Sequence, residues 1–342
     1  MKFLLTAINA KFIHSNPSIY SLRAGVGEKL QPYVELAEFT INESLESILE
    51  GIWKRQPKVI GFSCYIWNWK LIREILTELP KILPDTEIWL GGPEVTYDGP
   101  GLLSEFPQVT GIMVGEGEVT FREVLGQYVR EAESTGQSEQ QPEPDSIEQQ
   151  AADRTGTLAG KSVAERFGQI PGLCLASGYT APRELTDLTT LPFLYEDMEP
   201  FTNRIIYYET SRGCPYRCSY CLSSIDKKVR LRDIDVVKRE LQFFLDQNVK
   251  QVKFIDRTFN CDHKHAMEIW EYIYKHDNGV TNFHFEISAD ILREEEIVLL
   301  NRFRPGLAQL EIGVQSTNPE TIRAIHRVMD VDKLEKIVAA IH

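Results

Sequence analysis

Residues 209–224 read ETSRGCPYRCSYCLSS, and this stretch decides how the rest of the chain is interpreted. Three of the six cysteines of the chain, Cys214, Cys218 and Cys221, lie within it. The Cys-x3-Cys-x2-Cys spacing is compact enough for all three thiols to face one metal centre. Three thiolates can bind three irons of a cubane 4Fe–4S cluster, which leaves the fourth iron open to an outside ligand. The missing fourth cysteine is then a vacancy for a substrate or a cofactor.

A structural zinc site is the alternative interpretation of the three thiols. Zinc of that type takes four protein ligands, usually from two separated pairs. The nearest extra candidates are Cys261, His263 and His265, which follow the next predicted strand. The spacing of the three cysteines directly after a strand favours the cluster over zinc.

The cysteines follow the first strand of a repeating strand–helix pattern. The expected strands are residues 204–210, 251–256, 282–288 and 307–314, and the expected helices are residues 234–247, 264–276, 294–303 and 332–341. Four such units predict a partial (β/α) barrel over residues 201–342. The loop with the cysteines would then lie at the carboxyl ends of the strands, where barrel enzymes build their active sites.

Residues 1–130 show a second strand–helix alternation. The expected strands are residues 2–8, 34–39, 58–66, 87–92 and 111–118, and the expected helices are residues 17–30, 44–55, 70–83 and 119–131. Five strands interleaved with helices predict an α/β domain with a parallel, doubly wound sheet of the Rossmann or flavodoxin-like kind. Ligands of such sheets bind beyond the carboxyl ends of the strands, where this sequence places its glycines.

The residues between the two predicted domains differ in composition. Residues 131–166 contain no aromatic residue, and the segment 133–153 carries acidic side chains but no basic one. Such a segment buries too little apolar surface to offset its ordering entropy, so we expect a disordered acidic linker. We assign residues 167–200 to a connector that leads into the second domain.

Charge and hydropathy limit the partners and the location of the protein. The formal net charge of −13 disfavours general binding to nucleic acid. No segment approaches the length of a membrane span, and the apolar start at residues 3–8 lacks the cleavage site of a signal peptide. We therefore expect a cytoplasmic protein whose cysteines stay reduced, and clustered thiols in that compartment indicate metal or redox chemistry.

The segment CPYRCSYC, residues 214–221, resembles the signature of the radical S-adenosylmethionine (SAM) superfamily. The resemblance implies that Cys214, Cys218 and Cys221 bind a 4Fe–4S cluster whose open iron is chelated by SAM. It also implies reductive cleavage of SAM to a 5′-deoxyadenosyl radical, and it places Tyr220 against the adenine. An external electron donor of the flavodoxin or ferredoxin type would supply the electron.

Downstream polar residues are further candidates for binding SAM. By the same resemblance they are Glu286, Glu311, Gln315 and Ser316, which lie on or just after the third and fourth predicted barrel strands. Asp256 and Arg257, after the second strand, have the same standing. The alternative for each carboxylate is an ordinary salt bridge or a solvent-facing position. The sequence lacks the Gly-Gly-Glu pattern that many relatives show after the second strand, which leaves that contact to the methionine amine open.

The first predicted domain is similar to the cobalamin-binding domain of cobalamin-dependent radical SAM enzymes. The similarity rests on the segments GFSCY, LGGPEVT and VGEGE, each at the end of a predicted strand. It implies cobalamin-binding roles for Ser63, Tyr65, Gly91, Gly92, Pro93, Gly115 and Glu116. The Asp-x-His-x-x-Gly element of other cobalamin proteins is absent, which implies that no histidine binds cobalt. A flavodoxin-like or receiver-like domain without cobalamin is the alternative.

Together the two resemblances imply a cobalamin-dependent radical SAM enzyme, most commonly a transferase that methylates an unactivated carbon. Rearrangement, cyclisation or methylthiotransferase-like modification of RNA are the enzymatic alternatives, and a zinc or iron–sulfur binding module is the non-enzymatic one. The substrate, a small molecule or a peptide, is not identified by the sequence. Barrels of this superfamily usually contain six strand–helix units, and four are recognisable, so we expect an incomplete barrel.

Overall fold

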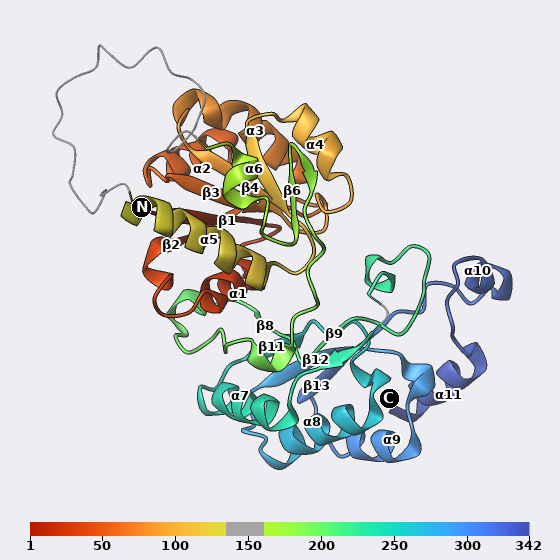
Figure 1. Ribbon diagram of the computed structural model, residues 1–342. Helices are drawn as coiled ribbons and strands as arrows, with labels where there is room; N and C mark the ends of the chain where they lie inside the picture. Colours follow the sequence, from red (N-terminus) through yellow and green to blue (C-terminus); the bar gives the residue numbers. More distant parts are fainter. Residues whose placement is uncertain (135–160, 227, 342) are drawn as a thin grey trace, which may run out of the picture. The chain divides into compact units, whose positions relative to one another are not determined.

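The computed structural model describes residues 1–134, 161–226 and 228–341. It divides the chain into two compact units (Figure 1). The first comprises Met1–Thr186 with Leu194–Asp197, and the second comprises Asp187–Phe193 with Met198–His342. The predicted acidic linker lies largely in residues 135–160, outside the described part of the chain. No helix among the described residues combines the length and the apolar character that crossing a bilayer requires.

A seven-stranded sheet forms the centre of the first unit, with the strand order β2-β1-β3-β4-β5-β6-β7. The strands are β1 (Phe3–Asn9), β2 (Val34–Thr40), β3 (Val59–Ser63), β4 (Glu87–Gly91), β5 (Val109–Met113), β6 (Leu173–Leu175) and β7 (Gly178–Tyr179). The first five pair in parallel, which confirms the predicted doubly wound sheet. Their order, 2-1-3-4-5, is that of flavodoxin-like folds.

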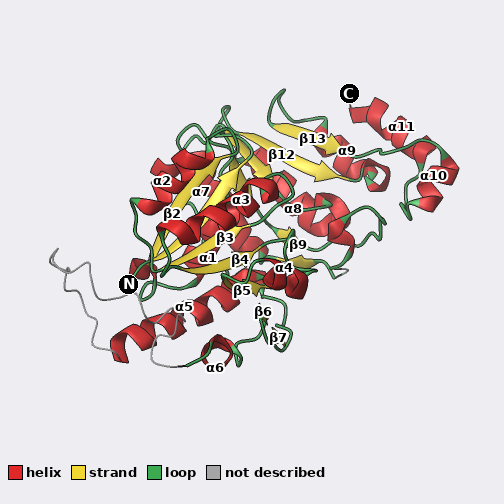
Figure 2. Cartoon of the chain, turned by 90° about the horizontal axis from the view of Figure 1, so that it is seen from above, coloured by secondary structure: helices red, strands yellow, loops and turns green. Residues whose placement is uncertain are grey.

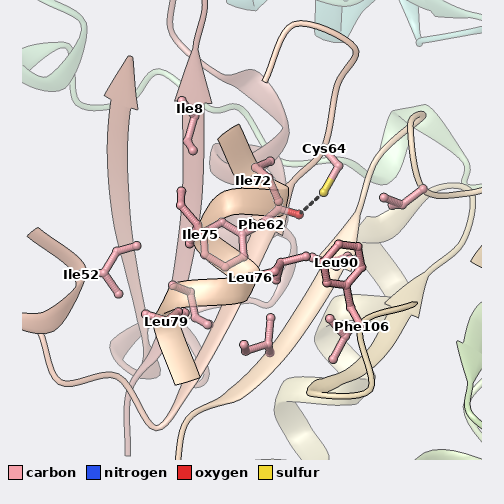
Figure 3. Close-up of a cluster of buried hydrophobic side chains, with 14 of the residues drawn as sticks. Ile8, Ile52, Phe62, Cys64, Ile72, Ile75, Leu76, Leu79, Leu90 and Phe106 are labelled. Carbon is pink, nitrogen blue, oxygen red and sulfur yellow. Dashed lines mark hydrogen bonds between the residues drawn. The ribbon is translucent and has the colours of Figure 1, made fainter. Parts of the chain in front are cut away.

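Apolar side chains cover both faces of this sheet, as a doubly wound fold requires. Successive residues of a strand point to opposite faces, so Leu4 and Ile8 of β1 enter one core while Phe3 and Leu5 enter the other. Figure 3 shows the first of these cores, in which apolar side chains of α3 (Trp69–Ile82) pack against strands β1, β3 and β4.

The helices of the first unit connect successive strands. They are α1 (Pro17–Gly25), α2 (Leu45–Trp53), α3, α4 (Gly99–Glu105), α5 (Gly117–Ser134) and α6 (Val163–Phe167). The hydroxyl of Ser44 accepts a hydrogen bond from Ser47 N at 3.2 Å, which caps α2 at its first turn. Helix α4 was not expected, because its sequence GPGLLSE combines two glycines and a proline in seven residues.

The described ends of the predicted linker and much of the predicted connector belong to the first unit. Helix α5 continues four residues beyond the expected boundary at residue 130, and α6 begins at Val163. Strands β6 and β7 add an antiparallel hairpin to β5. The guanidinium of Arg166 on α6 contacts carboxylate oxygens of Glu87 and Glu131 at 3.0 Å each. Strands β6 and β7 thus lie within residues 167–200, which the sequence analysis assigned to a connector.

The second unit contains a four-stranded parallel sheet in the order β13-β12-β11-β8. Its strands are β8 (Ile206–Tyr208), β11 (Gln251–Phe254), β12 (Asn282–Ile287) and β13 (Ala308–Ile312). Its helices are α7 (Ile234–Asp246), α8 (His263–Lys275), α9 (Glu294–Leu300), α10 (Pro319–Ala324) and α11 (Val331–Ile341). Figure 2 shows β12 and β13 side by side within this unit. The four predicted strand–helix units and the partial barrel are confirmed.

One face of this sheet packs on the helices and the other is polar. Phe254 and Phe285 are fully buried, and their rings lie 4.5 Å apart between centroids. Trp270 of α8 is also fully buried and meets the edge of Phe285 at 6.0 Å. Because side chains alternate along a strand, Lys253 of β11 and Glu286 of β12 lie on the opposite face. A barrel places that face inside.

Candidate metal centre and cofactor-binding edges

Residues 209–224, here named the cysteine loop, leave the carboxyl end of β8. The loop begins with strand β9 (Ser211–Arg212), which pairs antiparallel with β10 (Arg230–Leu231). Between them Gly213 has φ +101°, and a Cβ atom there would lie 2.5 Å from the carbonyl oxygen of Lys228. Only glycine tolerates this turn and this close approach of the backbone. The first cysteine follows directly, at a fixed point on the edge of the sheet.

The three thiols of the motif share the cysteine loop without forming a preassembled metal site. Cys214 and Cys218 are buried, Cys221 is partly exposed, and all three are free of disulfide bonds. Within the described residues, no three histidine, cysteine, aspartate or glutamate side chains converge so as to hold a metal ion. The donor set fits a cubane cluster with one open iron.

The extra ligands that a zinc site would need are buried or bound to other groups. Nδ1 of His263 lies 2.9 Å from Oε1 of Glu296, a fully buried carboxylate. His265 is buried in α8, and burial lowers its pKa. Burial, with a contribution from Cys214, raises the pKa of Cys261 to about 11, so its thiol stays protonated near neutral pH. These contacts do not support the alternative of a zinc site.

The second half of the cysteine loop is held by the turn that follows α10. Ser219 N donates to the carbonyl of Ile325 at 2.9 Å. The guanidinium of Arg327 donates to the hydroxyl of Tyr220 at 3.3 Å and to the carbonyl of Gly313 beyond β13, and it lies 4.0 Å from Sγ of Cys218. Sequence reasoning did not identify Arg327, because its role depends on where two loops meet and no local motif marks it.

Two of the predicted SAM-binding carboxylates lie opposite each other on neighbouring strands. Glu286 of β12 pairs in register with Glu311 of β13. Nζ of Lys253 lies 3.0 Å from Glu311 Oε2 and 3.8 Å from Glu286 Oε1. The hydrogen bond from Lys253 lowers the pKa of Glu311, whereas burial raises the pKa of Glu286. In the structure both carboxylates therefore have the ion-paired arrangement that we kept as the alternative.

The remaining SAM-binding candidates lie beyond the ends of the strands. Gln315 has φ +64°, an unusual value for a residue other than glycine. The hydroxyl of Ser316 accepts from Asn318 N at 3.1 Å and so takes part in the turn that begins α10. Tyr220 is 52% exposed on the cysteine loop. Arg327 connects Tyr220 to the carboxyl end of β13, because its guanidinium donates both to the hydroxyl of Tyr220 and to the carbonyl of Gly313.

Asp256 and Arg257 at the end of β11 differ in their surroundings. Arg257 is exposed. Asp256 is 1% exposed and accepts hydrogen bonds from the backbone of Thr210 and from the hydroxyls of Thr210 and Ser211. Burial raises the pKa of Asp256 to about 6, even though these hydrogen bonds favour its charged form. Its carboxylate is directed at the base of the cysteine loop, away from any open surface.

In the first unit, Ser63 and Tyr65 lie where β3 reaches the carboxyl edge of the sheet. Ser63 Oγ accepts from Asn16 Nδ2 at 3.2 Å, and the hydroxyl of Tyr65 lies 3.3 Å from Ser18 Oγ. The fully buried Asn68 donates to the carbonyls of Ile8 and Ser63 and accepts from Tyr65 N. This amide ties the ends of β1 and β3 together and orients both candidate residues.

The glycines at the same edge serve two different purposes. A Cβ atom on Gly92, whose φ is +110°, would lie 2.5 Å from the carbonyl oxygen of Cys64, so glycine is required there by the backbone of the chain itself. A Cβ atom on Gly91 would meet Met113 only at 3.7 Å, and one on Gly115 would meet nothing within 4 Å. The space beside the backbone is therefore open at Gly115, while at Gly91 it is bounded by Met113 without a clash.

The other two predicted cobalamin-binding residues have limited access to a ligand. Pro93 is partly buried next to Gly92. Glu116 Oε2 accepts a hydrogen bond from Thr186 N at 2.8 Å, which fixes the chain after β7 to the turn after β5. Exposed apolar side chains also follow the strands at this edge, including Ile66, Trp67 and Tyr97. A hydroxyl, open glycine backbone and exposed rings fit a large and partly apolar cofactor.

Two family models match the chain, one in each unit. Residues 4–125 match the B12 binding domain, and residues 208–342 match the radical SAM superfamily. The two matched segments contain all of the cobalamin-binding and SAM-binding residues considered above.

The curated relatives and solved structures that the chain resembles include several methyltransferases. The chain is 27% identical over 228 residues to the 2-(S-pantetheinyl)-carbapenam-3-carboxylate methyltransferase of Streptantibioticus cattleyicolor, covering 64% of this chain and 29% of that protein. It is 24% identical over 226 residues to the cobalamin-dependent radical SAM methyltransferase TokK of Streptomyces tokunonensis, covering 60% and 28%. The chain therefore spans less than a third of the length of these two relatives.

The fold is similar to that of the radical SAM methyltransferase TsrM from Kitasatospora setae, solved with tryptophan and a SAM analogue. The TM-score is 0.68 at 17% sequence identity, over 99% of this chain and 65% of that one. This likeness extends through both units of the chain and supports the fold of each.

Proposed function

We propose that this chain, a radical SAM protein with a cobalamin-binding domain, takes part in transferring a methyl group to an unactivated carbon. The observation that carries the proposal is the position of Cys214, Cys218 and Cys221. They are free thiols on one loop at the carboxyl end of β8, in a chain whose first unit has an open glycine edge. Neither feature alone indicates this chemistry, but the combination does.

The three motif cysteines are the proposed ligands of a 4Fe–4S cluster. When bound, such a cluster supplies one electron that cleaves SAM at its open iron, and cobalamin supplies the methyl group that is transferred. The chain itself provides three sulfur donors and shields two of them, Cys214 and Cys218, from solvent. Restricted access of water protects the donors from exchange and sets the electronic environment of an iron site.

The polar face of the four-stranded sheet is the proposed position of SAM. Glu286 and Glu311 offer carboxylate oxygens to the amino and ribose hydroxyl groups of SAM, with Gln315 and Ser316 at the strand ends. The ion pairs of Lys253 with both carboxylates hold them in place until SAM binds. Tyr220 presents a half-exposed ring, suited to stacking on adenine.

The carboxyl edge of the first sheet is the proposed position of cobalamin. Ser63 and Tyr65 offer hydroxyl groups, while Gly91 and Gly115 let a bulky ligand approach the backbone. Gly92, Pro93 and Glu116 shape the edge, because their contacts are within the chain. The proposal includes no histidine ligand for the cobalt of cobalamin.

The partners follow from the chemistry. A radical SAM protein needs a reductant, and we assign this role to an external donor of the flavodoxin or ferredoxin type. The substrate is a small molecule or a peptide. The six free thiols suit the reducing cytoplasm, where we place the protein.

Anaerobic reconstitution with iron and sulfide tests the proposal at its base. We expect about four irons per chain, a broad absorption near 400 nm, and loss of both in single Cys→Ala variants at positions 214, 218 and 221. Cys261→Ala is the matched control, because this thiol is near the loop but outside the motif. A colourless protein that retains zinc after the same treatment would refute the cluster.

A second measurement tests methyl transfer. Reconstituted protein that contains hydroxocobalamin is incubated with SAM labelled in its methyl group and with a reductant. We expect the label to appear on cobalamin, and Gly91→Val to weaken cobalamin binding because its side chain closes the open backbone. The change Ala176→Val, at an exposed position between β6 and β7, serves as the control. Label that never leaves SAM, with both cofactors bound, would exclude the proposed methyl transfer.

A further inference from the structure

Asp256 is a buried carboxylate that no proposed cofactor contact uses. Its Oδ2 accepts from Thr210 N at 3.0 Å, and its Oδ1 accepts from the hydroxyls of Thr210 and Ser211 at 2.6 Å each. All three donors therefore belong to the two residues at which β8 passes into the cysteine loop. The side chain is 1% exposed, so water does not compete for these hydrogen bonds.

The residues that Asp256 holds connect both ends of the loop. The carbonyl of Thr210 accepts a hydrogen bond from Arg232 N at 2.8 Å. Because Arg232 directly follows β10, the chain segments before and after the three cysteines meet at Thr210. Ser211 pairs with Leu231 in the short antiparallel ladder. A displacement of Thr210 would therefore move β9 and β10, the two strands that precede and follow the three cysteines.

The end of β11 contacts the loop a second time. Oγ1 of Thr258, two residues after Asp256, lies 3.5 Å from Sγ of Cys214. Asp256 and Thr258 thus hold the loop before Cys214 and at Cys214 itself. The start of the loop is thus held in place as far as Cys214.

We propose that Asp256 is a positioning residue, which fixes the start of the cysteine loop against β11 and thereby presents Cys214 for cluster binding. The proposal rests on the proposed function in one respect, namely that Cys214 is a cluster ligand. It differs from the sequence-based expectation that Asp256 points into the barrel toward SAM. Burying a carboxylate is costly unless several donors satisfy it, and here all the donors are at the base of the loop.

The isosteric change Asp256→Asn separates hydrogen bonding from charge. Its amide oxygen can accept from Thr210 N while its NH2 group donates to the two hydroxyls, which rotate to accept. Asp256→Ala removes every partner and leaves Thr210 N buried without an acceptor. Asn278→Ala is the matched control, because Asn278 also holds a turn through four hydrogen bonds, but before the amino end of β12.

Alkylation of the metal-free, full-length protein measures the position of the loop without any cofactor. Each variant is treated with iodoacetamide, and the rate at Cys214 is followed by peptide mass spectrometry. We expect Asp256→Ala to raise this rate about tenfold, the size of one lost charge-assisted hydrogen bond. Asp256→Asn should stay within about twofold of wild type, as should Asn278→Ala.

Iron retention then connects the position of the loop to the cluster. In reconstituted protein, we expect a chelator to remove iron from Asp256→Ala about tenfold faster than from wild type, with Asp256→Asn close to wild type. If Asp256→Ala does not fold, the double variant Thr210→Val and Ser211→Ala replaces it, because it removes both hydroxyl donors at nearly constant volume.

The outcomes separate this inference from the proposed function. Unchanged alkylation of Cys214 in Asp256→Ala, or an equal increase in Asn278→Ala, would overturn the positioning role. Faster alkylation in Asp256→Ala with no iron bound by wild type would instead overturn the cluster while leaving the positional effect established. A large loss in Asp256→Asn would show that the negative charge, or the direction of the hydrogen bonds from the two hydroxyls, is needed for positioning the loop.

Discussion

Gly92 shows how closely two turns approach each other at one residue. Its φ of +110° is strained for any other residue, and a Cβ atom would lie 2.5 Å from the carbonyl of Cys64. Cys64 is fully buried, and its amide donates to Gly91 O at 2.7 Å, so this backbone cannot move away easily. The contact joins the turns after β3 and β4.

We therefore expect Gly92→Ala to destabilise the protein by about 2–4 kcal/mol, from the left-handed backbone and the clash together. Gly115→Ala is the control, because its φ of +78° carries the same kind of strain with no atom within 4 Å. It should cost only about 1 kcal/mol. Urea unfolding of the metal-free variants measures both values, and equal losses would show that the clash is absent in solution.

The buried carboxyl of Asp256 predicts a pH dependence of stability. Its pKa in the folded protein is raised to about 6 from an ordinary value near 4, mainly by burial. The folded state therefore binds more protons than the unfolded state between these values, so this group's contribution to stability falls as pH rises from about 4 to 6. The loss is on the order of 1–3 kcal/mol.

Asp256→Asn lacks this titration and serves as the reference. We expect the free energy of unfolding of wild type, measured relative to this variant, to decrease between pH 4 and pH 7. Parallel pH profiles for the two proteins would contradict the raised pKa.

At the scale of elements, helix α6 is held to the first sheet by one buried cation. The side chain of Arg166 is 1% exposed, contacts Glu87 of β4 and Glu131 of α5, and lies over the rings of Tyr128 and Phe167. Removing one partner of a buried ion pair leaves uncompensated charge and typically costs about 3–5 kcal/mol.

Arg166→Ala should accordingly destabilise the first unit by about 3–5 kcal/mol. Lys81→Ala removes an exposed pair with Glu78 and should change stability by less than about 1 kcal/mol. Thermal unfolding at matched pH and salt compares the two. A loss of the same small size at both positions would mean that α6 is not docked through Arg166.

The elements that could be predicted from the sequence are those with strong local periodicity. The parallel strands, and α7 and α8 with their apolar stripes, follow from alternation and helical spacing. Strands β6 and β7 have only three and two residues, and their pairing depends on the distant strand β5. Helix α10 has six residues and begins with proline after a polar turn, too short for a periodic signal.

The same distinction explains the candidate sites. The three cysteines are recognisable because their spacing is local, and Gly91 because it ends a strand. The contacts of Asp256 with Thr210 and of Arg327 with Tyr220 could not be predicted, because they join residues more than forty positions apart in the chain. Contacts of that kind depend on tertiary packing, which no single segment encodes.

At the scale of the whole molecule, the two units have separate cores. The cores of the first unit lie on the two faces of the seven-stranded sheet, and Trp270 and Phe285 lie in the core of the second. We expect equilibrium unfolding in two steps, since each unit buries its own apolar surface.

Variants in each core assign the steps. Gly92→Ala should lower the midpoint of one transition, and Trp270→Ala should lower that of the other by about 3–5 kcal/mol in stability. Hydrogen exchange with mass spectrometry, followed through the denaturant series, identifies which peptides open in each step. A single transition that shifts with both variants would show that the units unfold as one.

The contact between Arg166 and Glu131 has a practical consequence for protein engineering. It brings the last turns of α5 and the short helix α6 together, so the described chain stops and resumes at neighbouring elements of the first unit. The entropy of closing a loop between fixed ends grows only with the logarithm of its length. A fluorescent or affinity module spliced in between α5 and α6 would therefore begin and end at neighbouring points of the first unit and is expected to leave its sheet folded.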